Sequence, residues 1–430
     1  MSHSILKKYG HFAIRDSGVP NESHDYVTLV LLHGFAWHSG VFSRLLPLVA
    51  KFNSRIILVN RRDYPGSDPL DEGEIRSISS IGDATPDANA ILDETLVQAE
   101  NIPRTGGLVV AGWSFAAAWV TALLANAADF SINGVQLGAY IRRAVLYDPP
   151  YHALGYPPPA KFYNPLSEPS LAAGEGVKLF PSWVSGYYLH GNSPAELEHR
   201  IALPEPRPTI ETMSKEDIEA ALFPPSANPG GSDQILMDTG IRCGLYAALR
   251  KAALYPPVSP LSSGNPESDW ASVTLRYIWC DRSVWEMPWG TWALQSELEN
   301  AKNVGIYSRR VQFVKLDGAN HFEIIEHLKM ELLEKMADLG SVRDLSQQKE
   351  REAAERALEI QDMRQSDLEG QLADLQQELR SSESTRQTLQ IQLENARADS
   401  EGINISLQET AQNLEQAEYC TPGTCNEWPE

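Results

Sequence analysis

The run Leu-Val-Val-Ala-Gly-Trp-Ser-Phe-Ala at residues 108–116 constrains the fold more than any other part of the sequence. Its first half is continuously apolar, which predicts a buried strand, and the alanine-rich residues 116–124 predict a helix directly after it. A strand that turns at once into a helix strains the backbone at the corner and leaves room there only for small side chains. Gly112 and Ala116, two positions before and after Ser114, meet that requirement. We therefore expect Ser114 at a sharp corner, with its hydroxyl group accessible at the sheet edge.

Such a corner combines a nucleophile with a site for negative charge. The backbone N–H of Phe115 opens the predicted helix, and helix N-termini stabilise anions. Phe115 would then supply half of an oxyanion hole. A Gly-x-Ser-x-Ala pattern also occurs at ordinary turns, so the surrounding segments decide its meaning.

Two apolar runs precede the corner, and each leads into a loop of turn-forming residues. Residues 27–32 predict a fully buried strand that is followed by His33, Gly34 and Phe35. Residues 55–60 predict another buried strand, followed by the turn-rich segment 61–67. We expect the backbone N–H of Phe35 to be the second donor of the oxyanion hole.

Three apolar runs follow the corner, and each precedes an ionisable residue. Residues 143–147 end before Asp148, residues 273–280 end before Asp281, and residues 311–316 lead into a loop that contains His321. A serine, an acid and a histidine thus follow three different predicted strands. Catalysis by Ser114 requires these side chains to meet at one edge of the sheet.

Four motifs together resemble the α/β-hydrolase superfamily, specifically the lidded serine hydrolases. They are His-Gly-Phe at 33–35, Asp-x-Pro-Gly-Ser at 63–67, the serine corner, and Gly-x-Asn-His-Phe at 318–322. The resemblance covers roughly residues 8 to 338. It implies an α/β fold with a mostly parallel central sheet, helices on both faces and an inserted lid. It also implies Ser114 as nucleophile, His321 as general base and then acid, and Asp281 as the acid that orients the imidazole.

The identity of the triad acid has alternatives. The stretch from Asp281 to His321 is long, and Asp148 occupies a position that a minority of relatives use. The order of the motifs favours Asp281 over Asp148, and Glu286 ranks third. Two departures from the usual pattern, Ala116 and Asn320 in place of glycines, remove no catalytic group.

Residues 149–270 separate two predicted core strands and are rich in proline. In the family that the chain resembles, an insertion here is a lid that selects substrates and excludes water. Aromatic residues are abundant in and around this insertion, although such residues often serve core packing alone. The substrate-pocket candidates are Trp113, Trp183, Tyr187 and Trp285, with Tyr188, Leu189, Trp289 and Trp292 nearby.

An aromatic, weakly charged pocket favours an uncharged, largely apolar ester, thioester or lactone. The expected reaction forms an acyl-enzyme on Ser114 and needs neither a metal nor an organic cofactor. Two other functions remain open. One is a catalytically idle fold that serves as a ligand receptor or coiled-coil scaffold. The other uses the same triad for acyl transfer, carbon–carbon bond hydrolysis or perhydrolysis.

The C-terminal part of the sequence has a different composition. Residues 345–418 contain no proline, and apolar residues recur there with alternating spacings of four and three. This heptad register predicts a coiled coil that pairs with a copy of itself or with another helix. Polar seam positions such as Gln365 and Arg386 weaken it, and a solitary charged helix is the alternative. We expect a hydrolase domain at 1–340, the coiled coil at 345–418 and a flexible tail at 419–430.

The chain carries a formal net charge of −21, and both parts are acidic. Residues 341–430 contain 8 Lys and Arg against 19 Asp and Glu. Binding to nucleic acid or to an anionic membrane requires a basic face, which the sequence lacks. The N-terminal residues lack the apolar core of a secretory signal, and no run approaches the length of a membrane span. We therefore expect a soluble, cytoplasmic protein.

Overall fold

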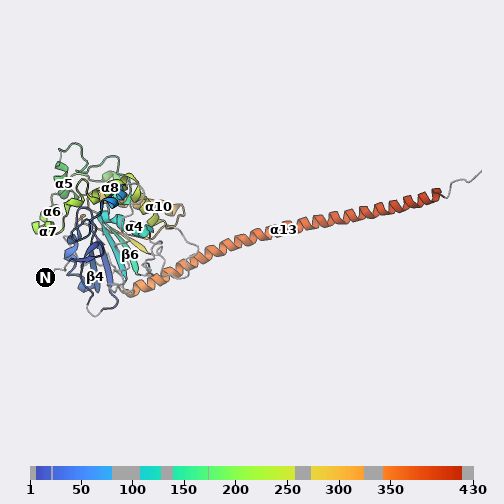
Figure 1. Cartoon of the computed structure of the whole chain (residues 1–430), viewed down its shortest axis with the longest axis horizontal. Helices are drawn as coiled ribbons and strands as arrows, with labels where there is room; N and C mark the ends of the chain where they lie inside the picture. The colour runs from blue at the N-terminus through green and yellow to red at the C-terminus, as the bar shows by residue number, and fades with distance from the viewer. Residues whose placement is uncertain are drawn as a thin grey trace, which may run out of the picture. The chain divides into compact units, whose positions relative to one another are not determined.

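One mostly parallel sheet of eight strands forms the centre of the first part of the chain, in the order β1-β2-β4-β3-β5-β6-β7-β8 (Figure 1). Among the described strands, β1–β2 and β2–β4 pair antiparallel and the other neighbours pair parallel. The strands are β1 (Lys7–Tyr9), β2 (Phe12–Asp16), β3 (Val27–Leu32), β4 (Ser54–Asn60), β5 (Leu108–Trp113), β6 (Ile141–Tyr147), β7 (Thr274–Cys280) and β8 (Val311–Leu316). The six strands predicted from apolar runs are confirmed within two residues, and the two N-terminal strands are additional.

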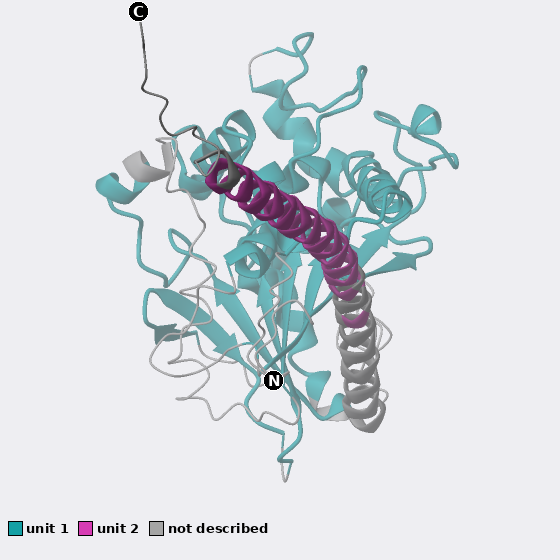
Figure 2. Ribbon diagram, turned by 90° about the vertical axis from the view of Figure 1, so that its right-hand side faces the viewer, with its two compact units in different colours: residues 1–343 teal, residues 344–430 magenta. Residues whose placement is uncertain are grey.

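This computed structural model describes residues 6–20, 23–79, 107–126, 138, 140–172, 174–256, 273–323 and 342–418. The chain divides into two compact units, residues 1–343 and 344–430, which are coloured separately in Figure 2. The predicted tail at 419–430 lies outside the described residues. The described part of the chain contains no helix suited to crossing a membrane.

Helices cover both faces of the sheet, because successive residues of the central strands point to opposite sides. In β3, Leu29 and Leu31 belong to one buried apolar cluster, and Val30 and Leu32 belong to the other. The helices are α1 (Glu72–Ser79), α4 (Ala117–Asn126), α5 (Glu175–Val184), α6 (Thr209–Thr212), α7 (Lys215–Glu219), α8 (Ser232–Arg242), α9 (Leu245–Leu254), α10 (Glu286–Asn303) and α13 (Val342–Glu418).

The chain between β6 and β7 contains the helices α5 to α9, and we refer to it as the β6–β7 insertion. It includes residues 149–270, which the sequence analysis predicts as a lid, although residues 257–272 are not described. The helix α9 packs extensively against α4, the helix that follows the serine corner. The insertion is therefore anchored on the core of the first unit.

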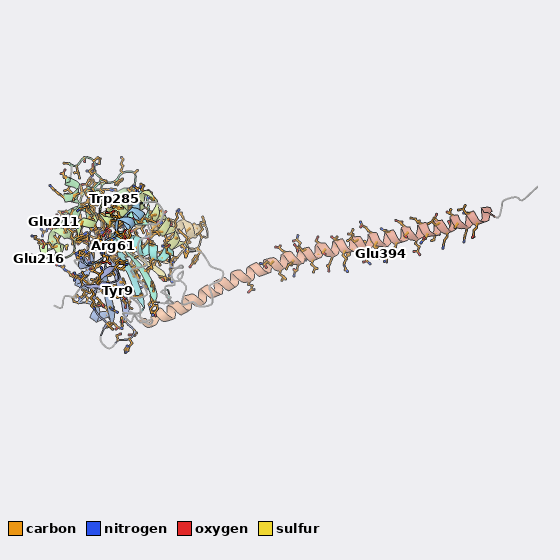
Figure 3. All side chains as sticks on the ribbon, in the orientation of Figure 1. Tyr9, Arg61, Glu211, Glu216, Trp285 and Glu394 are labelled. Atoms are coloured by element: carbon orange, nitrogen blue, oxygen red, sulfur yellow. The ribbon has the colours of Figure 1, made fainter. Side chains whose placement is uncertain are left out.

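The second unit is one continuous helix, α13, over the described residues (Figures 1 and 2). It contains 77 residues, which confirms the predicted helical state of the heptad segment. In Figure 3, side chains of its described residues, Glu394 among them, project to either side of the helix. Pairing with a second helix stays a prediction.

Candidate active site

Ser114 lies at the predicted corner, between the end of β5 and the start of α4. Its φ angle is +58°, in the left-handed region that non-glycine residues rarely adopt. A 3₁₀ turn, Ser114–Ala116, precedes α4, so the helix begins slightly later than predicted. A Cβ atom on Gly112 would lie 2.5 Å from the carbonyl oxygen of Ala116. The corner requires a small residue at position 112 because the backbone of residue 116 lies directly against it.

Asp148 occupies the equivalent position on the neighbouring strand. Trp113 and Tyr147 are register partners at the ends of β5 and β6, so Ser114 and Asp148 are the next residues of two adjacent strands. Asp148 also has a positive φ angle, +47°. Two strained polar residues therefore lie side by side at the carboxyl edge of the sheet.

His321 forms its hydrogen bond with Asp148 rather than with Asp281. The imidazole Nδ1 lies 2.7 Å from Oδ2 of Asp148, and both side chains are buried. The carboxylate of Asp281 instead accepts a hydrogen bond from the Gly318 N–H at 2.7 Å and faces Lys315. The expectation that Asp281 orients the imidazole is wrong in this geometry, because the Asp281 side chain, which follows β7, bonds to the turn after β8 instead.

Trp113 connects the serine corner to the histidine loop. Its indole N–H donates to the carbonyl oxygen of His321 at 3.0 Å, and its ring stacks on the imidazole at a centroid distance of 5.1 Å. Ser114 is the next residue along the chain, so His321 is held beside the corner from two directions. Trp113, which the sequence analysis assigns to the substrate pocket, is 2 % exposed and packs in the core.

The loop after β3 lies directly against the serine. A Cβ atom on Gly34 would approach Cβ of Ser114 to 2.8 Å, so only glycine permits this contact. The next peptide N–H is that of Phe35, whose ring meets the ring of Phe115 edge-on at 6.1 Å. Phe115 opens the helical turn after the serine, where backbone N–H groups have no partner one turn earlier. The two predicted oxyanion donors thus come from loops that meet at Ser114.

Sequence reasoning missed three residues behind the Phe35 loop: Arg61, Tyr64 and Asp233. All three are buried and joined by hydrogen bonds, and Figure 3 shows Arg61 within the α/β unit. Burial alone would lower the pKa of Arg61, but the adjacent Asp233 carboxylate reverses this and raises it. An arginine directly after a buried strand is the one sequence signal for this cluster, since a buried charge requires a partner.

The remaining pocket candidates pack among themselves. The indole N–H groups of Trp183 and Trp285 donate to the carbonyl oxygens of His199 and Tyr163, at 2.9 and 2.7 Å. Both tryptophans belong to an apolar cluster between the β6–β7 insertion and the start of α10. Tyr187 is buried as well. Contact of these side chains with substrate stays a prediction.

Two further ionisable groups of this unit have displaced pKa values. Burial raises the pKa of Glu286 to about 7, although a hydrogen bond from Asn164 acts in the opposite direction. The Glu286 carboxylate thus pairs with Asn164, whereas the imidazole Nδ1 of His321 pairs with Asp148. Burial lowers the pKa of His152, which lies against Phe115, to about 4. Among the described residues, no cluster of His, Cys, Asp and Glu has the arrangement of a metal site.

Comparison with known proteins agrees with this architecture. A sequence model described as the Alpha/beta hydrolase family matches residues 29–328. The chain belongs to the α/β-hydrolase family. No curated protein matches it in sequence.

Solved structures of several hydrolases are similar to this α/β-hydrolase at low sequence identity. An esterase from Rhodococcus sp. is 17 % identical, with 77 % of this chain and 95 % of the other covered and a TM-score of 0.37. An epoxide hydrolase from a metagenome of a hot environment is 15 % identical, with 77 % of this chain and 94 % of the other covered and a TM-score of 0.37. A lipase-esterase related protein from Clostridium acetobutylicum is 13 % identical, with 76 % of this chain and 99 % of the other covered and a TM-score of 0.40.

Proposed function

We propose that this α/β-hydrolase cleaves an ester-like bond through an acyl-enzyme on Ser114, with His321 as general base and Asp148 as the triad acid. The observation that carries the proposal is the buried hydrogen bond between His321 and Asp148 beside a strained serine corner. A serine hydroxyl at this corner suits attack on an acyl carbonyl. We propose an uncharged, largely apolar ester, thioester or lactone as substrate, since aromatic side chains dominate the surroundings of the corner.

The proposed mechanism follows from the roles of the two ring nitrogens. Because the Asp148 carboxylate accepts a hydrogen bond from Nδ1–H, the lone pair of His321 resides on Nε2. The Ser114 hydroxyl adds to the acyl carbonyl carbon as its proton passes to Nε2. The backbone N–H groups of Phe35 and Phe115 stabilise the oxyanion.

Collapse of this tetrahedral intermediate breaks the bond to the leaving group, which takes the proton from Nε2. Water then adds to the acyl-enzyme with His321 again accepting a proton, and the carboxylic acid leaves as Ser114 recovers its proton. Asp148 stabilises the imidazolium in both halves of the cycle and does not itself transfer a proton.

Labelling with a fluorophosphonate probe tests the nucleophile. We expect the wild-type protein to be labelled and Ser114→Ala to lose both labelling and turnover of a panel of aryl and alkyl esters. Ser43→Ala is the matched control, because Ser43 is an exposed serine outside the proposed site. Wild-type protein that resists labelling, hydrolyses no ester and yet binds a small apolar molecule would overturn the proposal in favour of an idle receptor.

Product analysis separates hydrolysis from other uses of the same triad. With an active ester and increasing concentrations of an alcohol or amine acceptor, a hydrolase continues to release mainly the free acid. Dominant transfer of the acyl group to the acceptor would assign an acyltransferase instead, because both reactions share the acyl-enzyme.

A further inference from the structure

A buried ion pair connects the β6–β7 insertion to the core directly behind the Phe35 loop. Asp233, on α8 of the insertion, receives two hydrogen bonds from the guanidinium of Arg61, at 2.6 and 2.8 Å. Tyr64 donates its hydroxyl proton to the same carboxylate at 2.5 Å. All three side chains are at most 5 % exposed. Asp233 thereby sets the positions of one guanidinium and one phenol.

The Arg61 guanidinium fixes the peptide that presents the first oxyanion donor. Its Nη2 donates to the carbonyl oxygen of Gly34 at 2.9 Å. This carbonyl and the N–H of Phe35 belong to one planar trans peptide and point in opposite directions. Holding the oxygen therefore sets the direction of the Phe35 N–H. A charged donor on the oxygen also polarises the peptide and strengthens its N–H as a donor.

His33 donates a second hydrogen bond to the same oxygen. Its Nε2 accepts from the Arg61 backbone N–H at 3.1 Å, so Nδ1 carries the proton and donates to the Gly34 oxygen, also at 3.1 Å. Burial, together with the Arg61 charge, holds the pKa of His33 well below its ordinary value. The imidazole is therefore neutral, as this arrangement requires.

Tyr64 fixes the peptide on the other side of Phe35. Its hydroxyl oxygen accepts the Ala36 N–H at 3.1 Å while its proton goes to Asp233. Ala36 has a φ angle of +65°, a strained conformation that needs external support. Both peptides that flank Phe35 are thus held by residues that share Asp233.

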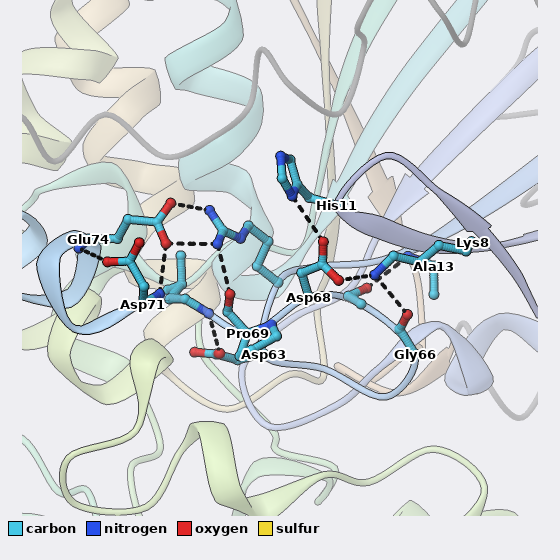
Figure 4. Close-up of polar contacts among 12 residues, drawn as sticks. Lys8, His11, Ala13, Asp63, Gly66, Asp68, Pro69, Asp71 and Glu74 are labelled. Carbon is cyan, nitrogen blue, oxygen red and sulfur yellow. Dashed lines mark hydrogen bonds and ion pairs between the residues drawn. The ribbon is translucent and has the colours of Figure 1, made fainter.

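Backbone contacts from the insertion support the same loop. The Phe223 N–H donates to the Ala36 carbonyl oxygen at 2.7 Å, and the His38 N–H donates to the Ala221 carbonyl oxygen at 2.8 Å. The segment that carries Arg61 and Tyr64 is secured on its outer side by surface contacts, among them His11 with Asp68 (Figure 4). The loop is thus hydrogen-bonded both to the segment after β4 and to the β6–β7 insertion.

We infer that Asp233 is a positioning residue for the oxyanion hole, acting through Arg61 and Tyr64 on the two peptides around Phe35. In this role the β6–β7 insertion is part of the catalytic framework as well as a cover. The inference rests on the proposed serine hydrolase function. It locates one determinant of turnover outside the triad, on a helix of the insertion.

Kinetics of two variants test the inference. Removing one oxyanion donor costs about 10² to 10³ in kcat, and a displaced donor costs part of that. We expect Asp233→Asn and Tyr64→Phe to lower kcat and the fluorophosphonate inactivation rate about tenfold or more, with KM changed less than about threefold. Tyr64→Phe retains the buried ion pair, so it remains informative if Asp233→Asn, which leaves Arg61 without its counter-charge, fails to fold.

Asp16→Asn is the matched control, because Asp16 forms a buried two-bond pair with Arg55 at 2.9 and 2.6 Å on strands β2 and β4. It is expected to lower stability without changing kcat per titrated active site. Wild-type kcat per active site in Tyr64→Phe and Asp233→Asn would overturn the inference.

Hydrogen exchange of residues 34–38 separates this inference from the proposed function, because it requires no activity. Faster exchange there in Tyr64→Phe than in Asp16→Asn is expected even if the wild-type protein resists the probe. Wild-type protein that the probe does not label would refute the proposed serine hydrolase. Unchanged hydrogen exchange in Tyr64→Phe would refute the inferred positioning of the Phe35 loop.

Discussion

Asp148 illustrates how single residues organise this site. Its carboxylate accepts hydrogen bonds from the Cys280 N–H at 2.9 Å, from the Ser283 hydroxyl at 2.6 Å and from His321. These donors come from the end of β7, the loop after it and the loop after β8. The left-handed backbone at Asp148 is supported by these contacts, because a buried carboxylate with several donors has one favourable orientation.

Substitution of the two aspartates distinguishes their roles. In Asp148→Asn we expect kcat to fall by about 10³ to 10⁴, because an amide no longer fixes the imidazole tautomer or stabilises its cation. Asp281→Asn is expected to change kcat less than about threefold, since Asp281 bonds to the Gly318 N–H in a half-exposed turn. Steady-state ester hydrolysis measures both. A loss in Asp281→Asn that equals the loss in Asp148→Asn would refute the assignment.

Glu286 makes stability depend on pH. Its pKa of about 7, raised from 4.5 by burial, means that the folded protein keeps a proton that the unfolded chain has lost between those values. Stability therefore falls as pH rises through this window, by about 3 kcal/mol for the whole shift, and levels off above it.

Urea unfolding of Glu286→Gln tests this effect. The variant keeps a partner for Asn164 and cannot ionise, so its unfolding midpoint should decrease less than that of the wild type from about pH 5 to about pH 8. Glu299→Gln, an exposed change on the same helix, serves as control and should follow the wild type. Identical pH profiles for Glu286→Gln and the wild type would contradict the prediction.

At the scale of elements, the loops at the carboxyl edge are tied to the insertion as well as to the sheet. Asn320, in the histidine loop, donates through Nδ2 to the Ser185 carbonyl oxygen at 2.7 Å and to Oγ1 of Thr209 at 2.8 Å. Its side-chain oxygen accepts the Phe322 N–H at 2.9 Å. The asparagine that departs from the usual glycine therefore connects the loop after β8 to the β6–β7 insertion.

Asn320→Ala should disturb both stability and turnover. The change removes three buried hydrogen bonds, although the Ser185 carbonyl oxygen keeps the one that it accepts from the Thr209 N–H, so we expect the free energy of unfolding to fall by about 2 to 4 kcal/mol. The folded fraction should also lose kcat, because His321 is the adjacent residue. Asn126→Ala, which removes one bond to the Ala122 carbonyl oxygen near the end of α4, should cost about 1 kcal/mol and leave kcat unchanged. Denaturant titration measures the change in stability, and steady-state kinetics measures the change in kcat. If Asn320→Ala is as stable as the wild type, the Asn320 hydrogen bonds do not stabilise the fold.

The elements were predictable where local pattern decides them. Apolar runs predicted six strands, and the small residues around Ser114 predicted the corner, because strand burial and close backbone approach act over a few positions. The aspartate that pairs with His321 was not predictable in this way, because Asp148 and Asp281 both follow buried strands. Which aspartate pairs with the imidazole depends on the hydrogen-bond donors of Cys280, Ser283 and His321, and these residues are remote from Asp148 in sequence. The pairing of Arg61 with Asp233 was likewise inaccessible, since 172 positions separate them.

At the scale of the whole molecule, the second unit carries an apolar seam that a single helix cannot bury by itself. Eight leucine and isoleucine side chains at seam positions between residues 372 and 414 are 52 to 62 % exposed along α13. An isolated helix gains nothing from such a stripe, whereas a second helix with the same register buries it. We therefore propose that α13 associates with another copy of itself. Polar residues such as Arg386 within the seam limit the strength of that pairing.

Two neighbouring substitutions test self-association of α13. Leu389 occupies the seam, and Ile391, two residues further along the helix, projects about 200° away around the axis. Both are 59 % exposed in the single helix, so each change to glutamate has the same cost there. If the seam pairs, Leu389→Glu places a charge in the helix interface and shifts the solution mass to that of a monomer, whereas Ile391→Glu retains the oligomer. Light scattering of the full chain at micromolar concentration measures this, with ester hydrolysis expected to be unchanged in both variants. A monomeric wild type, or equal masses for the two variants, would refute pairing through this seam.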